Sequence, residues 1–388
     1  KSYNDLIVAI RARKPNEKVK IKLKRGDEEK EVELTFAKRD GSSGRPFTSY
    51  LGGQRANAMK EQGKGGNETG GIYRSEDGGD TWRRVNSLNP RPFYYSQIFV
   101  DPSNDKNIYV LGIQFHFSSD SGKTFKTGGR GVHPDHHALW VNPRDGRHLI
   151  LGCDGGLYIT HDRGGTWDFH NVMDIGQFYD VGVDTRAPYW VYGGLQDNGS
   201  WGARSRKRGR TGTENSDWLR IGGGDGFLCR ADPKDPFTVY CEMQGGRIWR
   251  VNVKTGARYT LRPPGKSLKF NWKTPFTLSH HNSHIIYCAG NYIFRSLNRG
   301  ENLKRISPKI SHSDKGTATA LSESPRNADV LWCGTDDGAL WITRNGGKDW
   351  KNIVEQVGLP KAFHVSSIEA SRYAEGRAYV AFDGHRSN

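Results

Sequence analysis

The chain has 388 residues, a formal net charge of +16, and 49 glycines beside 11 tryptophans and 16 tyrosines. No apolar run approaches the roughly 18 residues that a membrane-spanning helix needs, so the sequence predicts no membrane span. Abundant glycine and aromatic residues suit many short strands joined by tight turns. At this length the chain can form one large domain of that kind and a smaller fragment.

The first forty residues differ in pattern from the rest of the chain. Leu6 and Ile10 mark the apolar face of a predicted helix, and two strands with alternating polarity follow at 19–24 and 31–36. This order of helix and closing strands resembles the C-terminal half of a PDZ domain. The resemblance implies a small α+β fragment over residues 1–40.

A segment rich in glycine and polar residues follows at 41–70, and its composition predicts a linker. The large domain is therefore expected to occupy residues 71–388.

One short pattern, Ser/Thr-x-Asp-x-Gly-x-Thr-Trp, returns along that domain. Clear copies begin at Ser75, Ser118 and Thr160, and weaker ones begin at Ser296 and Thr343. In a tight hairpin the Asp or Asn bonds back to the turn backbone while Gly supplies the positive φ, so these positions are predicted to be structural. They are Asp77, Asp120, Asp162, Asn298 and Asn345. The pattern resembles the Asp-box, or BNR repeat, of sialidases, sortilin-type receptors and xyloglucanase-type glycoside hydrolases.

A second repeat runs in phase with the Asp-boxes and occurs seven times. Each copy is an apolar strand, a turn that often contains Pro, and a second apolar strand, as in Phe99 to Tyr109 and Trp140 to Ile150. Combined with the Asp-box hairpin, each unit is predicted to be a four-stranded antiparallel sheet. The expected fold class is all-β, a β-propeller whose blades are these sheets.

The chain ends bear on the number of blades. Residues 71–83 supply only the third and fourth strands of a blade, and residues 363–384 supply only the first and second. Pairing of the two ends would complete a seventh blade and remove exposed sheet edges. The alternative is that the sequence is part of a larger or double propeller.

Residues of a predicted binding face come from the starts of first strands and from the turns between second and third strands. Carboxylates, amides and aromatic rings that converge on a concave mouth suit a carbohydrate, and a protein ligand is the other possibility. The candidates are Tyr95, His136, His137, Gln177, Tyr179, Gln196, Asn198, Trp201, Trp272, Asp336, His385 and Arg386. No metal site is predicted, because neighbouring residues of a strand, such as His136 and His137, point to opposite faces. No cofactor is expected.

Two segments of the predicted mouth are longer than a turn requires, at 192–201 and 221–227. The first resembles a Gly-Leu-Gln-Asp-Asn-Gly segment of large bacterial secreted BNR-repeat proteins, which implies a secreted or periplasmic location. The second resembles the segment that bears a catalytic acid in xyloglucanase-type enzymes, although it is shorter here. The main hypothesis is therefore a binding protein. The alternative is a glycoside hydrolase acting on a β-glucan, with Asp197 and Asp225 as its acid and base.

The positive charge is locally concentrated in one run, formed by Arg204, Arg206, Lys207, Arg208 and Arg210. Such a run attracts polyanions, so it is either a solvated loop or a contact for an acidic polymer. No nucleic-acid-binding motif accompanies it, and no nucleic acid partner is expected.

Overall fold

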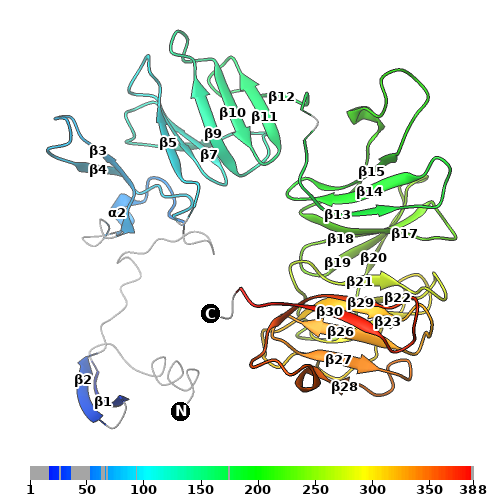
Figure 1. Ribbon diagram of the computed structural model, residues 1–388. Coiled ribbons are helices and arrows are strands. Elements are labelled where there is room, and N and C mark those ends of the chain that lie inside the picture. Colours follow the sequence, from blue (N-terminus) through cyan, green and yellow to red (C-terminus); the bar gives the residue numbers. More distant parts are fainter. Residues whose placement is uncertain are drawn as a thin grey trace. The chain divides into compact units, whose positions relative to one another are not determined.

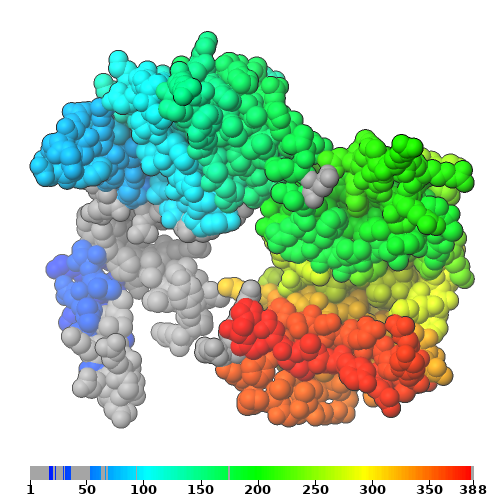
Figure 2. Space-filling view, turned by 45° about the horizontal axis from the view of Figure 1, so that its top comes forward, coloured from blue at the N-terminus to red at the C-terminus, as the bar shows by residue number. Residues whose placement is uncertain are grey.

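The computed structural model describes residues 17–25, 28–35, 53–62, 66, 69–92, 94–173 and 175–385 (Figure 1). The chain divides into two compact units, Lys1–Val172 and Met173–Asn388. In the space-filling view the second unit, green to red, is a continuous packed body (Figure 2). No helix of the described residues is long and apolar enough to cross a membrane.

Two strands of the N-terminal region match those predicted from the alternating pattern. β1 (Lys18–Arg25) pairs antiparallel with β2 (Glu28–Thr35), with Val19 opposite Leu34 and Lys24 opposite Glu29. The predicted helix near Leu6 lies outside the described residues. A two-stranded hairpin is common to many folds, so the PDZ-like assignment stays a prediction.

The rest of the first unit consists of sheets that follow one another in chain order. A two-stranded sheet, β3-β4, is followed by two four-stranded sheets, β5-β6-β7-β8 and β9-β10-β11-β12. The strands are β3 (Ile72–Arg74), β4 (Arg83–Asn86), β5 (Gln97–Val100), β6 (Ile108–Leu111), β7 (Phe115–Ser118), β8 (Lys126–Gly128), β9 (His136–Val141), β10 (Leu149–Cys153), β11 (Gly156–Thr160) and β12 (Asp168–His170).

Part of the predicted linker packs against the first strands. The short helix α2 (Met59–Gln62) follows Ala58, which is buried and whose N–H donates to Ser87 Oγ at 2.7 Å. Asn57 bonds through its side chain to the carbonyl of Phe125 at 2.9 Å. Composition predicted a linker over 41–70; within it, residues 57 and 58 bond to residues that border strands β8 and β4 of the first unit.

The second unit repeats the same sheet four times and ends in a hairpin. Its sheets are β13-β14-β15-β16, β17-β18-β19-β20, β21-β22-β23-β24, β25-β26-β27-β28 and β29-β30. The strands are β13 (Phe178–Val183), β14 (Trp190–Leu195), β15 (Gly199–Arg204), β16 (Leu219–Gly222), β17 (Gly226–Ala231), β18 (Thr238–Met243), β19 (Arg247–Asn252), β20 (Arg258–Leu261), β21 (Phe276–Leu278), β22 (Ile286–Ala289), β23 (Ile293–Ser296), β24 (Lys304–Arg305), β25 (Ala318–Glu323), β26 (Leu331–Thr335), β27 (Leu340–Thr343), β28 (Lys351–Asn352), β29 (His364–Ala370) and β30 (Ala378–Asp383).

Within each unit, neighbouring four-stranded sheets pack on one another through buried apolar side chains. Tyr240 on β18, Ile286 on β22 and Phe294 on β23 belong to one such buried cluster. Each complete sequence repeat thus forms one four-stranded sheet. Its strands are antiparallel and follow chain order, as the repeat predicted. This is the strand pattern of propeller blades.

The Asp-box hairpins are held by bonds from the turn to the boxed side chains. Thr124 donates to Asp120 through its N–H at 2.9 Å and through its hydroxyl at 2.6 Å, and Gly122 N–H donates to Ser118 Oγ at 2.9 Å. The boxes at Asp77 and Asp162 make the same bonds. Burial alone would raise the pKa of Asp120, but the bonds from Thr124 and Ser118 hold it below its ordinary value.

Asp120→Ala should therefore destabilise the first unit. The loss of the bond from Thr124 N–H to the Asp120 carboxylate is expected to cost about 1 kcal/mol of unfolding free energy, the typical net contribution of one hydrogen bond. Thermal unfolding of the variant measures it. Unchanged stability together with lost ligand binding would instead assign Asp120 to a binding role.

Candidate functional site

The side chain of Asp225 forms hydrogen bonds that link two neighbouring blades of the second unit. Asp225 lies between β16 and β17 and is buried. One carboxylate oxygen accepts the N–H of Asp197 at 3.0 Å, and the other accepts the side-chain amide of Gln244 at 2.8 Å. The side-chain oxygen of Gln244 in turn accepts the N–H of Asp225 at 3.1 Å. The structure therefore brings the backbone of Asp197 to the side chain of Asp225.

The same two blades also lie close together through their backbones, at Gly194 of one blade and Gly226 of the other. A Cβ atom at Gly194 on β14 would lie 2.1 Å from the carbonyl carbon of Gly226 and 2.2 Å from the backbone nitrogen of Phe227. Gly199 N–H also donates to the carbonyl of Gly224 at 2.8 Å. The run of glycines in 192–201 therefore serves contact between sheets, which sets the position of the turn at 196–198.

Three aromatic rings line up beside that turn. Tyr179 on β13 packs against Phe227 on β17 with ring centroids 4.6 Å apart, and Phe227 meets Trp272 edge-on at 6.4 Å. Phe227 is buried, while Trp272 is 59% exposed and Tyr179 is 36% exposed. Burial, with a smaller contribution from the charges of Asp225 and Asp197, raises the pKa of Tyr179. Two exposed rings are thus held in place by a buried one.

Polar groups of the turn are ordered next to these rings. The hydroxyl of Tyr179 donates to Gln196 Oε1 at 3.2 Å, and the indole N–H of Trp201 donates to the carbonyl of Asn198 at 2.7 Å. The N–H of Gln196 donates to the carbonyl of Gln177 at 2.9 Å. These contacts place predicted residues Gln177, Tyr179, Gln196, Asn198 and Trp201 in one group. We call Tyr179, Gln196, Asn198, Phe227 and Trp272 the ring patch.

Other candidates of the second unit lie outside the ring patch. Asp336 accepts the N–H and the hydroxyl of Thr317 at 2.8 and 2.9 Å, which is the role of a turn brace. His385 is exposed and bonds to Asp383 at 2.6 Å. The bonds from His385 lower the pKa of Asp383. Arg386 lies outside the described residues.

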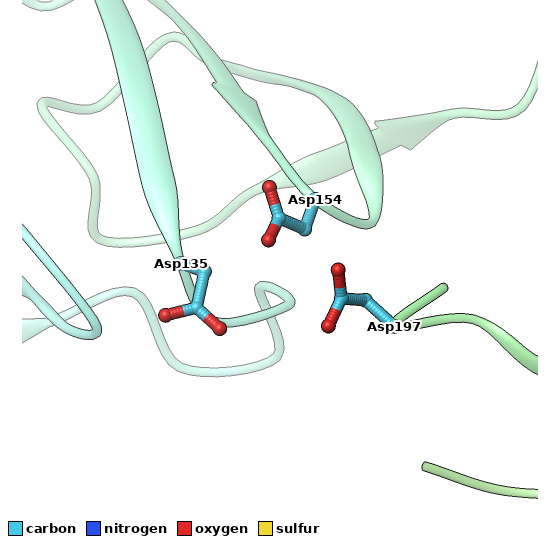
Figure 3. Close-up of side chains that lie close together, drawn as sticks. All are labelled: Asp135, Asp154 and Asp197. Atoms are coloured by element: carbon cyan, nitrogen blue, oxygen red, sulfur yellow. The ribbon is translucent and has the colours of Figure 1, made fainter. Parts of the chain in front are cut away.

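In the first unit, a second polar and aromatic group surrounds two aspartates. Figure 3 shows Asp135 at the start of β9 and Asp154 on the turn between β10 and β11. Asp135 accepts the hydroxyl of Tyr95 and pairs with Arg91 at 3.0 Å, and His137 Nε2 contacts Asp154 at 2.8 Å. The rings of Tyr95 and His137 are 4.5 Å apart. Figure 3 also labels Asp197, which belongs to the second unit.

Arg91 was missed by sequence reasoning. Its guanidinium lies 4.0 Å from the ring centroid of Tyr95 and 4.9 Å from that of Tyr94, so it fixes both rings as well as Asp135. Arg91 lies in an irregular connection before β5, where no periodic pattern marks which side chains face inward. Only the folded chain brings Arg91 next to Asp135, the residue before β9.

His136 occupies a different environment from His137. It is 3% exposed, and burial lowers its pKa, with partial opposition from the backbone carbonyls near its ring. Nearby His116 is also buried, and burial followed by the charge of His136 lowers its pKa to about 4. The difference in burial between His136 and His137 arises because neighbouring side chains of a strand point to opposite faces of the sheet. His137 therefore faces the exposed group, and His136 faces the core.

Comparisons with known proteins agree with a propeller. A family model described as sortilin, neurotensin receptor 3 matches residues 70–179, which is less than half of the chain. The repeated four-stranded antiparallel sheets are themselves consistent with a β-propeller. A comparison with the sequences of curated proteins found no match.

Solved structures with some similarity come from several organisms. The extracellular domain of BT4673 from B. thetaiotaomicron is 15% identical, with 74% of this chain and 37% of that chain covered and a TM-score of 0.39. The GH74 xyloglucanase from Xanthomonas campestris is 16% identical, with coverage of 72% and 49% and a TM-score of 0.32. YCF48 from Cyanidioschyzon merolae is 10% identical, with coverage of 74% and 92% and a TM-score of 0.37. The chain thus spans well under half the length of the first of these proteins.

Proposed function

We propose that this chain is an extracellular or periplasmic β-propeller binding protein and that its ligand is a carbohydrate. The observation that carries the proposal is the ring patch, in which the exposed rings of Tyr179 and Trp272 both contact the buried ring of Phe227 and Tyr179 bonds to the amide of Gln196. Sugar rings stack on aromatic faces, and their hydroxyls bond to amides and carboxylates. Tyr179 and Trp272 would stack on the sugar, and Gln196 and Asn198 would bond to its hydroxyls.

The first unit adds a group of the same chemistry. Tyr95 and His137 are rings beside the carboxylates of Asp135 and Asp154. We assign these two rings to ligand contact as well. His136 is not assigned to the binding surface, because its side chain is buried.

Contacts of Asp225 favour binding over hydrolysis. A catalytic acid must hold a proton for its substrate, and a catalytic base must have a free lone pair facing it. Asp225 is 7% exposed, and its two oxygens accept bonds from Asp197 N–H and from the amide of Gln244, so the side chain is held within the fold and little of it is open to a substrate. These contacts support a role for Asp225 in positioning the turn that carries Gln196 and Asn198.

A glycan array on the intact chain, followed by a reducing-sugar assay on every glycan that binds, tests this proposal. We expect binding to a set of related glycans and no turnover of them. Turnover of a β-glucan that disappears in Asp225→Asn would replace the proposal by the glycoside hydrolase alternative. Failure to bind any carbohydrate would contradict both.

The same proposal includes the domain arrangement. We assign residues 1–40 to a PDZ-like half domain and 71–388 to a seven-bladed propeller, with six four-stranded blades and a seventh made from β29, β30, β3 and β4. The two-stranded sheets β3-β4 and β29-β30 supply complementary halves of such a blade. A disulfide between cysteines introduced on β3 and β30 should form without loss of stability. Failure of every such pair to cross-link would contradict ring closure.

A further inference from the structure

The end of the second unit opposite the ring patch carries a different set of side chains. In an antiparallel sheet the turn after the first strand and the hairpin after the third strand lie at the same end. For the blades β13-β16 and β17-β20 these connections are residues 184–189, 205–218, 232–237 and 253–257. The hydroxyl of Thr185 donates to the carbonyl of Pro233 at 3.3 Å, which joins the turns of the two blades.

Cations and aromatic rings alternate across this end. The guanidinium of Arg186 lies 4.6 Å from the ring centroid of Trp190 and 5.3 Å from that of Phe237, so it bridges the two blades. On either side, Arg204 lies 6.0 Å from Trp190 and Lys254 lies 5.6 Å from Phe237. We call these five residues the cation platform. Such contacts hold long side chains in place, so a ligand that binds them has less side-chain entropy to remove.

The long loop after β15 begins directly after Arg204 of this platform and runs to β16 (Figure 1). Lys207 pairs with Glu214 at 2.9 Å and with Asp217 at 2.7 Å, and these contacts brace the loop. Arg206, Arg208 and Arg210 are exposed. Of the five cations of the run, Lys207 holds the loop, Arg204 belongs to the cation platform, and the other three face solvent. In several other blades this connection is a short Asp-box turn, so the loop is a local addition.

Acidic groups of the same end do not cancel this charge. Asp184 is buried and bonds to Arg186, and Asp235 bonds to Arg299 at 3.2 Å. Glu214 and Asp217 are held by Lys207. Asp184 thus pairs with Arg186, Asp235 pairs with Arg299, and Glu214 and Asp217 share Lys207. The further cations of this end, Arg204, Arg206, Arg208, Arg210 and Lys254, leave the local potential positive.

We propose that the cation platform and the exposed arginines of the loop form a binding surface for an acidic polysaccharide, one with carboxylate or sulfate groups along its chain. Guanidinium groups bind such anions in a bidentate geometry. Single-stranded nucleic acids are bound by cations together with free aromatic faces on which bases stack. Here Arg186, Arg204 and Lys254 lie over the rings of Trp190 and Phe237, so those faces are occupied. This surface is separate from the ring patch and does not depend on it.

Binding of heparin and of polygalacturonate to the intact chain tests the proposal, with an oligothymidine of matched charge as the competing class. At least one of the two polysaccharides should bind, with an affinity that falls steeply as salt rises. The triple variant Arg206→Gln, Arg208→Gln, Arg210→Gln should weaken that binding about tenfold or more at about 50 mM salt. It leaves Lys207 and the loop brace intact.

The matched control removes the same charge from the hairpin after β27, with Arg344→Gln, Lys348→Gln and Lys351→Gln. These three residues are exposed and belong to the equivalent hairpin of another blade. The control should change affinity less than about twofold. An equal loss in the control, or no binding of either polysaccharide by the wild type, would overturn the proposal. Oligothymidine binding as tight as the polysaccharide would overturn the assignment of the polymer class.

Discussion

Gly194→Ala should destabilise the second unit by about 3 kcal/mol, because the new methyl group has no room. It would meet the backbone at Gly226 and Phe227 at 2.1 and 2.2 Å, and backbone cannot rotate away as a side chain can. The two blades would have to separate, which would also displace the turn that carries Gln196. Chemical denaturation of the variant measures the loss.

Gly152→Ala is the matched control for that experiment. Gly152 lies on β10, the second strand of its blade as β14 is of its own, and its added Cβ would lie 3.8 Å from the nearest atom, in ordinary contact. We expect its stability to stay within about 0.5 kcal/mol of the wild type. A Gly194→Ala variant as stable as Gly152→Ala would show that the blades are not packed this closely.

Glu242→Gln should remove a pH dependence of the second unit. Glu242 on β18 is fully buried; one carboxyl oxygen accepts the N–H of Thr274 at 2.6 Å, and the other has no hydrogen-bond partner. Burial raises its pKa from 4.5 to about 8, against smaller effects of nearby N–H groups and Lys273. The folded chain thus keeps a proton that the unfolded chain releases.

The direction of the pH effect follows from that raised pKa. The stability linked to the proton of Glu242 is fully present below about pH 4 and is lost as the pH rises toward about 8, by roughly 5 kcal/mol in all. Gln carries no such proton, so the stability difference between variant and wild type should grow in favour of the variant from pH 5 to pH 8. The buried histidines titrate in both proteins and cancel in the difference. A difference independent of pH would contradict the raised pKa.

Regular parts of the fold could be predicted from the sequence because the repeats encode local geometry. The Asp-box at Asp120 specifies its own turn through bonds within seven residues, from Ser118 to Thr124. The apolar alternation of Phe99 to Tyr109 likewise predicted β5 and β6. These patterns involve only residues close together in the chain, so a single sequence is enough to recognise the turn and the strands.

The candidate site depended on contacts that no local pattern encodes. Gln244 reaches Asp225 across 19 positions, and Arg91 reaches Asp135 across 44. The sequence offered Asp225 as a catalytic carboxylate only under the glycoside hydrolase alternative, and it gave no sign of the donors that two other turns supply to its oxygens. Residues 53–62 illustrate the same limit, because a polar, glycine-rich composition does not reveal the bond from Ala58 to Ser87.

The most direct test of the proposed function is the dissociation constant of the best glycan from the array, measured for the wild type, Trp272→Ala and Trp82→Ala. Both tryptophans are well exposed, at 59% and 64%, but Trp82 belongs to an Asp-box hairpin in the other unit. Loss of one stacking ring should weaken binding about tenfold in Trp272→Ala, while Trp82→Ala binds as the wild type does. Equal dissociation constants for Trp272→Ala and the wild type would contradict carbohydrate binding at the ring patch.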